Sequence, residues 1–190
     1  PVARIFAFTT RNGIVRSEAF QEIGGFNEKY TTNAMEDYDF GKRLAGKFPV
    51  AMSNGPLIYH NFPSKLSGLL RNYWVRAKLF VPFYLDKRPT LDKAMTSRNE
   101  ALLRLLGSGG LFLLLVGILL FGLFGKLAFL LSSLGAVMLM IYIVCLKDFI
   151  ILVLTQSGSY LFLLNCLGIH LLSSVVIVAG AFYGLLEWFT

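Results

Sequence analysis

Residues 111–124 read LFLLLVGILLFGLF and lie in an uncharged interval of 21 residues between Arg104 and Lys126. A second interval, of 20 uncharged residues, follows and ends before Lys147. A helix needs about 20 apolar residues to cross the hydrocarbon core of a bilayer, so each interval predicts one membrane span. We place these two spans at about 107–125 and 127–146.

The next uncharged interval, 149–186, has 38 residues, which is nearly twice the length that one span requires. The polar cluster TQSGS at 155–159 therefore predicts a break, with a short interfacial helix before it and a third span over 160–186. His170 lies in this third span. We expect its imidazole to bond to a neighbouring helix, and a functional role is the alternative.

The composition separates the chain into two parts. Its 190 residues are 55% hydrophobic and 15% charged, with a mean hydropathy of +0.62, which excludes an ordinary soluble domain and a disordered chain. Residues 1–104 hold 16 of the 18 Lys and Arg residues and 9 of the 11 acidic residues. The positive-inside rule predicts that this part lies in the cytoplasm, at the plasma membrane. Because the rule also accounts for the net charge of +7, we expect no nucleic-acid partner.

The water-facing part has the pattern of a mixed α/β domain. Short strands are expected at 4–9, 49–52 and 57–59, and helices at 17–23, capped by Ser17, and at 36–44. Gly24 and Gly25 are expected to end the first helix with positive φ angles. So few elements make a poor independent core, and we expect the back half of a larger domain. The predicted organisation is a partial α/β domain (1–62), an interfacial helix and linker (63–104) and an all-α transmembrane region (105–190).

Two helix surfaces stand out. The segment 64–81 places apolar and aromatic side chains on one face and basic side chains on the other, and Pro82 is expected to end it. Its apolar face suits either the headgroup layer of an anionic leaflet or the core of the domain. In the last span, Gly180 and Gly184 are four residues apart, a spacing that lets another helix approach closely.

The acidic pair Glu36-Asp37, followed by Asp39, is the one cluster with catalytic potential. A carboxylate in the first turn of a helix is held ionised by the exposed N–H groups and the helix dipole, so it can accept a proton as a general base. The alternative is that these acids only stabilise the start of the helix.

Three stretches occur in an order that is more specific than any one of them. They are GIVRSEAFQEIGGFNEKY (13–30), AMEDYDFGKRL (34–44) and VAMSNGPLIYHN (50–61). Together they resemble the C-terminal half of the catalytic domain of family 2 glycosyltransferases, which have the GT-A fold. The resemblance covers about residues 8–80, and the tail ending in AGAFYGLLEW is similar to that of membrane-attached members. The matching residues are Arg16, Gly24, Gly25, Phe26 and Glu28, then Glu36, Asp37, Phe40 and Arg43, then Tyr59 and His60, with Asn27 in place of the usual Asp.

This resemblance implies an inverting transfer of a sugar from a nucleotide-sugar to a hydroxyl of a lipid, lipid-linked or polysaccharide acceptor of the cell envelope. Asp37 would take the acceptor proton, and Glu36 would help to position the hydroxyl. Arg16 and Gly25 would lie on the substrate-binding side. The leaving diphosphate would be neutralised by Mg²⁺ or Mn²⁺, which His60 would approach, and by basic side chains.

The stretch RNYWVRAK, 71–78, looks like the basic and aromatic segment that follows the catalytic core in such enzymes. Arg71, Arg76 and Lys78 would contact a diphosphate, and Trp74 would stack on a sugar or anchor at the membrane interface. The alternative for all four is attraction to lipid headgroups without a catalytic part. The corresponding alternative for the whole protein is a non-catalytic membrane scaffold or partner subunit that binds anionic lipid. The pattern leaves open whether several copies assemble.

The nucleotide-binding half of the family, with its D-x-D metal motif, is not among these 190 residues. We therefore predict that the purified 190-residue chain alone transfers no sugar. Incubation with labelled nucleotide-sugars and divalent metal tests this prediction, and detectable turnover contradicts it.

Overall fold

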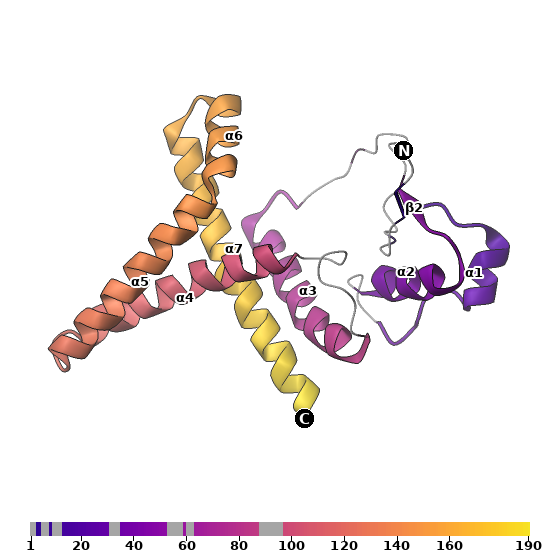
Figure 1. Cartoon of the computed structure of the whole chain (residues 1–190), viewed down its shortest axis with the longest axis horizontal. Helices are drawn as coiled ribbons and strands as arrows, with labels where there is room; N and C mark the ends of the chain where they lie inside the picture. Colours follow the sequence, from indigo (N-terminus) through magenta and orange to yellow (C-terminus); the bar gives the residue numbers. More distant parts are fainter. Residues whose placement is uncertain are drawn as a thin grey trace. The chain divides into compact units, whose positions relative to one another are not determined.

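The structure, a computed structural model, describes residues 3–4, 8, 13–30, 35–52, 59, 63–87 and 97–190. Seven helices and two short strands occur in these ranges (Figure 1). The chain forms two compact units. The first runs from residue 1 to Arg98 and includes 180–190, and the second comprises residues 99–179.

The water-facing part of the first unit is organised around Phe40. Helix α1 (Ser17–Ile23) packs on helix α2 (Glu36–Lys47), which carries Phe40 and Leu44 one turn apart on its buried face. The predicted helix at 36–44 is confirmed and extends to Lys47. The aromatic rings that surround Phe40, with centroids 4.9–5.3 Å away, belong to Phe8, Phe20 and Phe26.

A pair of glycines ends α1, as predicted. Gly24 has φ +81° and Gly25 has φ +66°, and their N–H groups donate to the carbonyls of Gln21 and Phe20, both at 3.0 Å. The predicted cap by Ser17 is wrong, because Ser17 is already helical and the residue at the cap position is Arg16, which makes no side-chain cap bond.

The expected α/β fold class is also wrong. Strands β1 (Ala3–Arg4) and β2 (Ala51–Met52) form one antiparallel ladder of two residues each, and the other elements in the described ranges are helices. Such a ladder is too short to organise a core. The buried apolar residues instead come mainly from helices, which satisfy their backbone hydrogen bonds without a partner strand. Of the strand expected at 57–59, only Tyr59 is described, and it is exposed and not in a strand.

Helix α3 (Leu66–Lys87) is longer than predicted, because Pro82 lies inside it and does not end it. One face of α3 buries Phe83 against Met35, the residue that precedes α2. Of the two interpretations of this apolar face, the structure supports packing on the domain. The partly buried residues around this contact are Tyr30, Tyr38, Val75, Leu79 and Phe80.

Another part of α3 packs on the C-terminal segment of helix α7 (Tyr160–Phe189), which belongs to the same unit. A Cβ atom at Gly180 would lie 2.9 Å from the carbonyl oxygen of Trp74, and one at Gly184 would overlap the carbonyl of Lys78. The proline at 82 has no N–H, so that carbonyl lacks its helical hydrogen-bond donor. The predicted close approach at these glycines is therefore confirmed, and α3 is the partner helix.

The second unit is built on the hairpin of α4 (Arg98–Leu120) and α5 (Gly125–Cys145), which lie side by side (Figure 1). Their backbones meet at glycine: a Cβ at Gly135 would lie 2.5 Å from the nitrogen of Leu114 and 2.7 Å from the oxygen of Gly110. Helix α6 (Lys147–Ser157) follows, and Gly158, with φ +63°, separates it from α7. The predicted break in the long apolar interval is confirmed.

Three helices are long and apolar enough to cross a membrane, namely α4, α5 and α7. The prediction of three spans is confirmed, and these helices identify the chain as a membrane protein. The bounds differ at the first span, since α4 begins at Arg98 and includes residues that were expected in the linker.

The contact at Gly135 gives a test of the hairpin. We expect Gly135→Ala to lower the free energy of unfolding by about 1–3 kcal/mol, because the new methyl group overpacks two backbones. Thermal unfolding in detergent measures the effect. Gly168→Ala on α7 is the control, because nothing lies within 4 Å of its Cβ position and it should be neutral or stabilising. Equal midpoints for the Gly135 variant and the wild type would contradict this packing.

Candidate functional site

The candidate site starts at the first turn of α2, which contains Glu36, Asp37 and Asp39. The preceding residue, Met35, provides no side-chain cap, while Lys47 lies in the last turn. Acids at the start of a helix and a base at its end both complement the helix dipole. Glu36 and Asp37 are half-buried, whereas Asp39 is 2% exposed. The first turn therefore carries two partly buried carboxylates and one internal one.

Arg43 joins this helix to the glycine turn that follows α1. Its Nε donates to Oδ2 of Asp39 at 2.9 Å, and its two terminal nitrogens donate to the carbonyls of Ile23 and Gly25, both at 2.7 Å. Charged hydrogen bonds of this length are among the strong ones, and the planar guanidinium holds all three acceptors at once. Arg43 thereby fixes the acidic helix against the turn.

The sequence alone indicated neither this role of Arg43 nor the burial of Asp39. The signal that was missed is the spacing of four residues between Asp39 and Arg43, which places the two side chains on one helix face and favours an ion pair. The two carbonyl acceptors lie 18 and 20 residues away along the chain and carry no signal in the side-chain pattern. The three-dimensional fold supplies them.

Glu36 has a feature of its own. Its Oε2 atom is buried and accepts no hydrogen bond within the described part of the chain. A buried acceptor without a donor costs about 1–3 kcal/mol. The predicted role of Glu36 in positioning an acceptor stays a prediction, since this oxygen is enclosed by the protein.

The predicted binding residues on α3 divide into two groups. Lys78 donates to Glu187 of α7 at 2.8 Å, and Trp74 lies with its ring centroid 5.7 Å from that of Tyr183. The hydrogen bond to Glu187 raises the pKa of Lys78. Both side chains thus contact the end of α7. By contrast, Arg71 is exposed, and Arg76 donates to Asn72 at 3.1 Å.

The remaining predicted residues are placed as follows. Gly25 belongs to the turn that Arg43 holds, and Arg16 is exposed at the start of α1. His60 lies outside the described residues, so its predicted role near a metal stays a prediction. Tyr30 feels the charges of this region: burial raises the pKa of its hydroxyl, and the negative charges of Asp39 and Asp86 raise it further.

No group of three His, Cys, Asp or Glu side chains converges on a metal-sized site among the residues that the structure describes. The expected Mg²⁺ or Mn²⁺ was predicted to depend on a D-x-D motif outside this chain.

Comparisons with protein-family models, with curated proteins and with solved structures found no match for this chain. The resemblance to family 2 glycosyltransferases accordingly rests on the motifs in the sequence.

The hydrogen bonds of Arg43 predict a stability effect. Arg43→Lys keeps the charge but cannot reach three acceptors, so we expect a loss of about 2–3 kcal/mol in the stability of the α1–α2 region. Hydrogen exchange of the α1 and α2 amides, measured in detergent, reports this loss.

The matched control for that experiment is Lys47→Gln, which breaks the exposed pair with Glu22 at 3.5 Å. We expect this variant to change stability by less than about 0.5 kcal/mol. Exchange in Arg43→Lys no faster than in Lys47→Gln would show that the guanidinium does not hold the turn.

Proposed function

We propose that this chain is part of a membrane-bound inverting glycosyltransferase, which transfers a sugar from a nucleotide-sugar to a hydroxyl of a lipid or lipid-linked acceptor. The observation that carries the proposal is the set of hydrogen bonds made by Arg43. These bonds hold together two motif stretches that are separate in the sequence. One is the glycine turn after α1 and the other is the acidic helix α2. The first turn of this helix carries Glu36 and Asp37.

In the proposed reaction, the acceptor hydroxyl attacks the anomeric carbon of the donor sugar. The bond between the hydroxyl oxygen and this carbon forms as the bond from the carbon to the diphosphate breaks, and the nucleoside diphosphate leaves with the electron pair. Asp37 accepts the hydroxyl proton as general base. Glu36 orients the hydroxyl through the exposed part of its side chain. A divalent metal ion, when bound, would neutralise the leaving diphosphate.

The packing of the first unit supports an acceptor that is held at the membrane. Met35 precedes the two carboxylates and is completely buried, in contact with Phe83 of α3. Helix α3 in turn packs on the last turns of α7, a candidate membrane span. Glu36 and Asp37 directly follow Met35, so they lie in a unit that also contains the C-terminal end of an apolar helix. This placement favours an acceptor that is held close to the bilayer.

We predict that Asp37→Asn reduces sugar transfer at least about a hundredfold, because the amide cannot accept the proton. Membranes containing the protein expressed from its complete gene are incubated with radiolabelled nucleotide-sugars and divalent metal, and label in the lipid extract is counted. Glu36→Gln should raise KM more than it lowers kcat, because an amide still fills the site but positions the hydroxyl less well. Glu18→Gln, on the exposed surface of α1, is the control and should retain activity.

Two outcomes would contradict the proposal. One is normal transfer by Asp37→Asn, which would remove the proposed base. The other is absence of transfer by the wild type from any donor of a panel of UDP-, GDP- and dTDP-linked sugars. The second outcome would favour the scaffold function, for which exposed Lys65 and Arg71 on the surface before and within α3 supply positive charge.

A further inference from the structure

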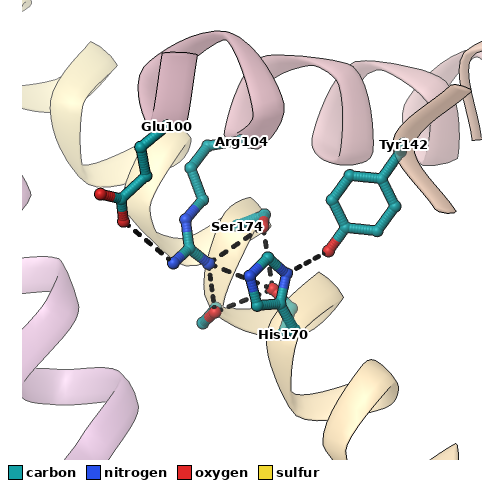
Figure 2. Close-up of polar contacts among 6 residues, drawn as sticks. Glu100, Arg104, Tyr142, His170 and Ser174 are labelled. Carbon is teal, nitrogen blue, oxygen red and sulfur yellow. Dashed lines mark hydrogen bonds and ion pairs between the residues drawn. The ribbon is translucent and has the colours of Figure 1, made fainter. Parts of the chain in front are cut away.

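A polar cluster lies inside the second unit, where α4, α5 and α7 meet (Figure 2). At its centre, Arg104 donates through Nη1 to the hydroxyl oxygens of Ser173, at 2.8 Å, and Ser174, at 3.3 Å. The two serines are 3% and 0% exposed. In the same cluster, the hydroxyl of Tyr142 on α5 and Nδ1 of His170 on α7 share a hydrogen bond. The expectation that His170 bonds to a neighbouring helix is thus confirmed.

The positive charge of Arg104 has one ion-pair partner among the described residues, the partly exposed carboxylate of Glu100. The side chain of Arg104 is 13% exposed, and its Nη1 contacts only neutral oxygens, including the carbonyl of His170 at 3.4 Å. Its Nη2 reaches Glu100 at 3.3 Å, a long distance for a charged pair. A mostly buried arginine with a single long ion pair is costly in an apolar region, and polar residues in membrane-spanning helices mark functional sites by default.

One edge of the guanidinium is covered in this structure and would receive an anion only if its neighbours moved. The Nε and Nη2 atoms form the fork that receives two oxygens of one phosphate or carboxylate. Within the described part of the chain, Nε has no acceptor, and Nη2 has the long contact to Glu100. The carboxylate of Glu100 is 49% exposed, so it can move aside into the surroundings. The edge is therefore covered by a displaceable group.

Two members of the cluster lie near the ends of the apolar runs of the hairpin. Arg104 is the last charged residue before the apolar run of α4, and Tyr142 lies close to the end of α5. On the hairpin, Arg104 and Tyr142 therefore lie at the edge of the apolar runs, whereas Ser173 and Ser174 lie midway along α7. The tyrosine ring lies against Gly107, whose missing side chain gives it space, and is 1% exposed.

We propose that Arg104, with the hydroxyl groups of Ser173 and Ser174, forms a binding site for a phosphate group in the second unit, and that Glu100 occupies part of this site when it is empty. The Nε–Nη2 edge of the guanidinium binds two phosphate oxygens. The serine hydroxyls, which now donate to the carbonyl of His170 at 2.8 Å, hold the guanidinium in place. This inference does not depend on the proposed transferase activity.

The experiment measures phosphate binding to the purified full chain in a neutral detergent by the rise in thermal unfolding temperature. Two probes distinguish the sources of the phosphate: a short-chain phosphatidic acid and inorganic phosphate, with short-chain diacylglycerol as the uncharged control. Stabilisation by phosphatidic acid alone identifies a lipid headgroup, and stabilisation by both probes identifies the phosphate group itself.

We expect Arg104→Gln to weaken binding roughly tenfold or more, since it removes the bidentate fork, and Arg104→Lys to weaken it nearly as much, although the charge is kept. Glu100→Gln should strengthen binding several-fold, because it removes the competing carboxylate. Lys126→Gln removes one positive charge from the turn between α4 and α5 and should leave binding unchanged.

The Glu100 variant decides between a binding site and a purely structural ion pair. If Glu100 only stabilises Arg104, Glu100→Gln lowers the unfolding temperature and binds phosphate no better, which overturns the proposal. Equal losses in Lys126→Gln and Arg104→Lys also overturn it, because they indicate general charge attraction. The proposal is also overturned if neither phosphatidic acid nor inorganic phosphate stabilises the wild type. If Arg104→Gln does not fold, Arg104→Lys and Glu100→Gln still give the answer.

Discussion

The bilayer places one constraint on this chain from which the rest of its architecture follows: within hydrocarbon, every backbone N–H and C=O group needs a partner inside the protein. Helices meet this requirement locally, so the apolar half of the chain forms α4, α5 and α7. Because lipid tails are as apolar as the helix surfaces, there is little hydrophobic force to hold the helices together, and close packing replaces it. Gly110 and Gly135 provide that packing by bringing the backbones of α4 and α5 into contact.

Close packing at glycine also holds helix α3 in the first unit. Its Phe83 face covers Met35 next to the acidic helix, and the backbone at Trp74 and Lys78 receives Gly180 and Gly184 of α7. Pro82 contributes because it leaves the Lys78 carbonyl without its helical donor at the point where Gly184 approaches. A glycine Cα–H group near such a carbonyl forms a weak but favourable contact. One helix thus contacts both the candidate site and a membrane helix.

Two arginines show how differently the same side chain is used in the two units. Arg43 has three good acceptors, one of them the buried carboxylate of Asp39. Its guanidinium is therefore well hydrogen-bonded within the fold. Arg104 has neutral acceptors, an ion pair of 3.3 Å with Glu100 and, among the residues that the structure describes, no acceptor for its Nε. A satisfied guanidinium is typical of a structural element, whereas an unsatisfied one in an apolar unit indicates a place for an anion. The contrast separates a positioning role for Arg43 from a binding role for Arg104.

The sequence by itself determined the elements whose signal is local. Uncharged runs of about 20 residues predicted the three spans, the polar stretch at 155–159 predicted the break, and paired glycines predicted the end of α1. It predicted the wrong fold class, because the strand-like stretches at 4–9 and 49–52 organise a sheet only if long partner strands exist, and within the described residues the ladder pairs only Ala3–Arg4 with Ala51–Met52. The long-range contacts had no local signal: the carbonyl acceptors of Arg43, the hydroxyl partners of Arg104 and the packing of α3 on α7. Tertiary structure alone decided them, because backbone carbonyls are the same at every position and only folding determines which ones a distant side chain meets.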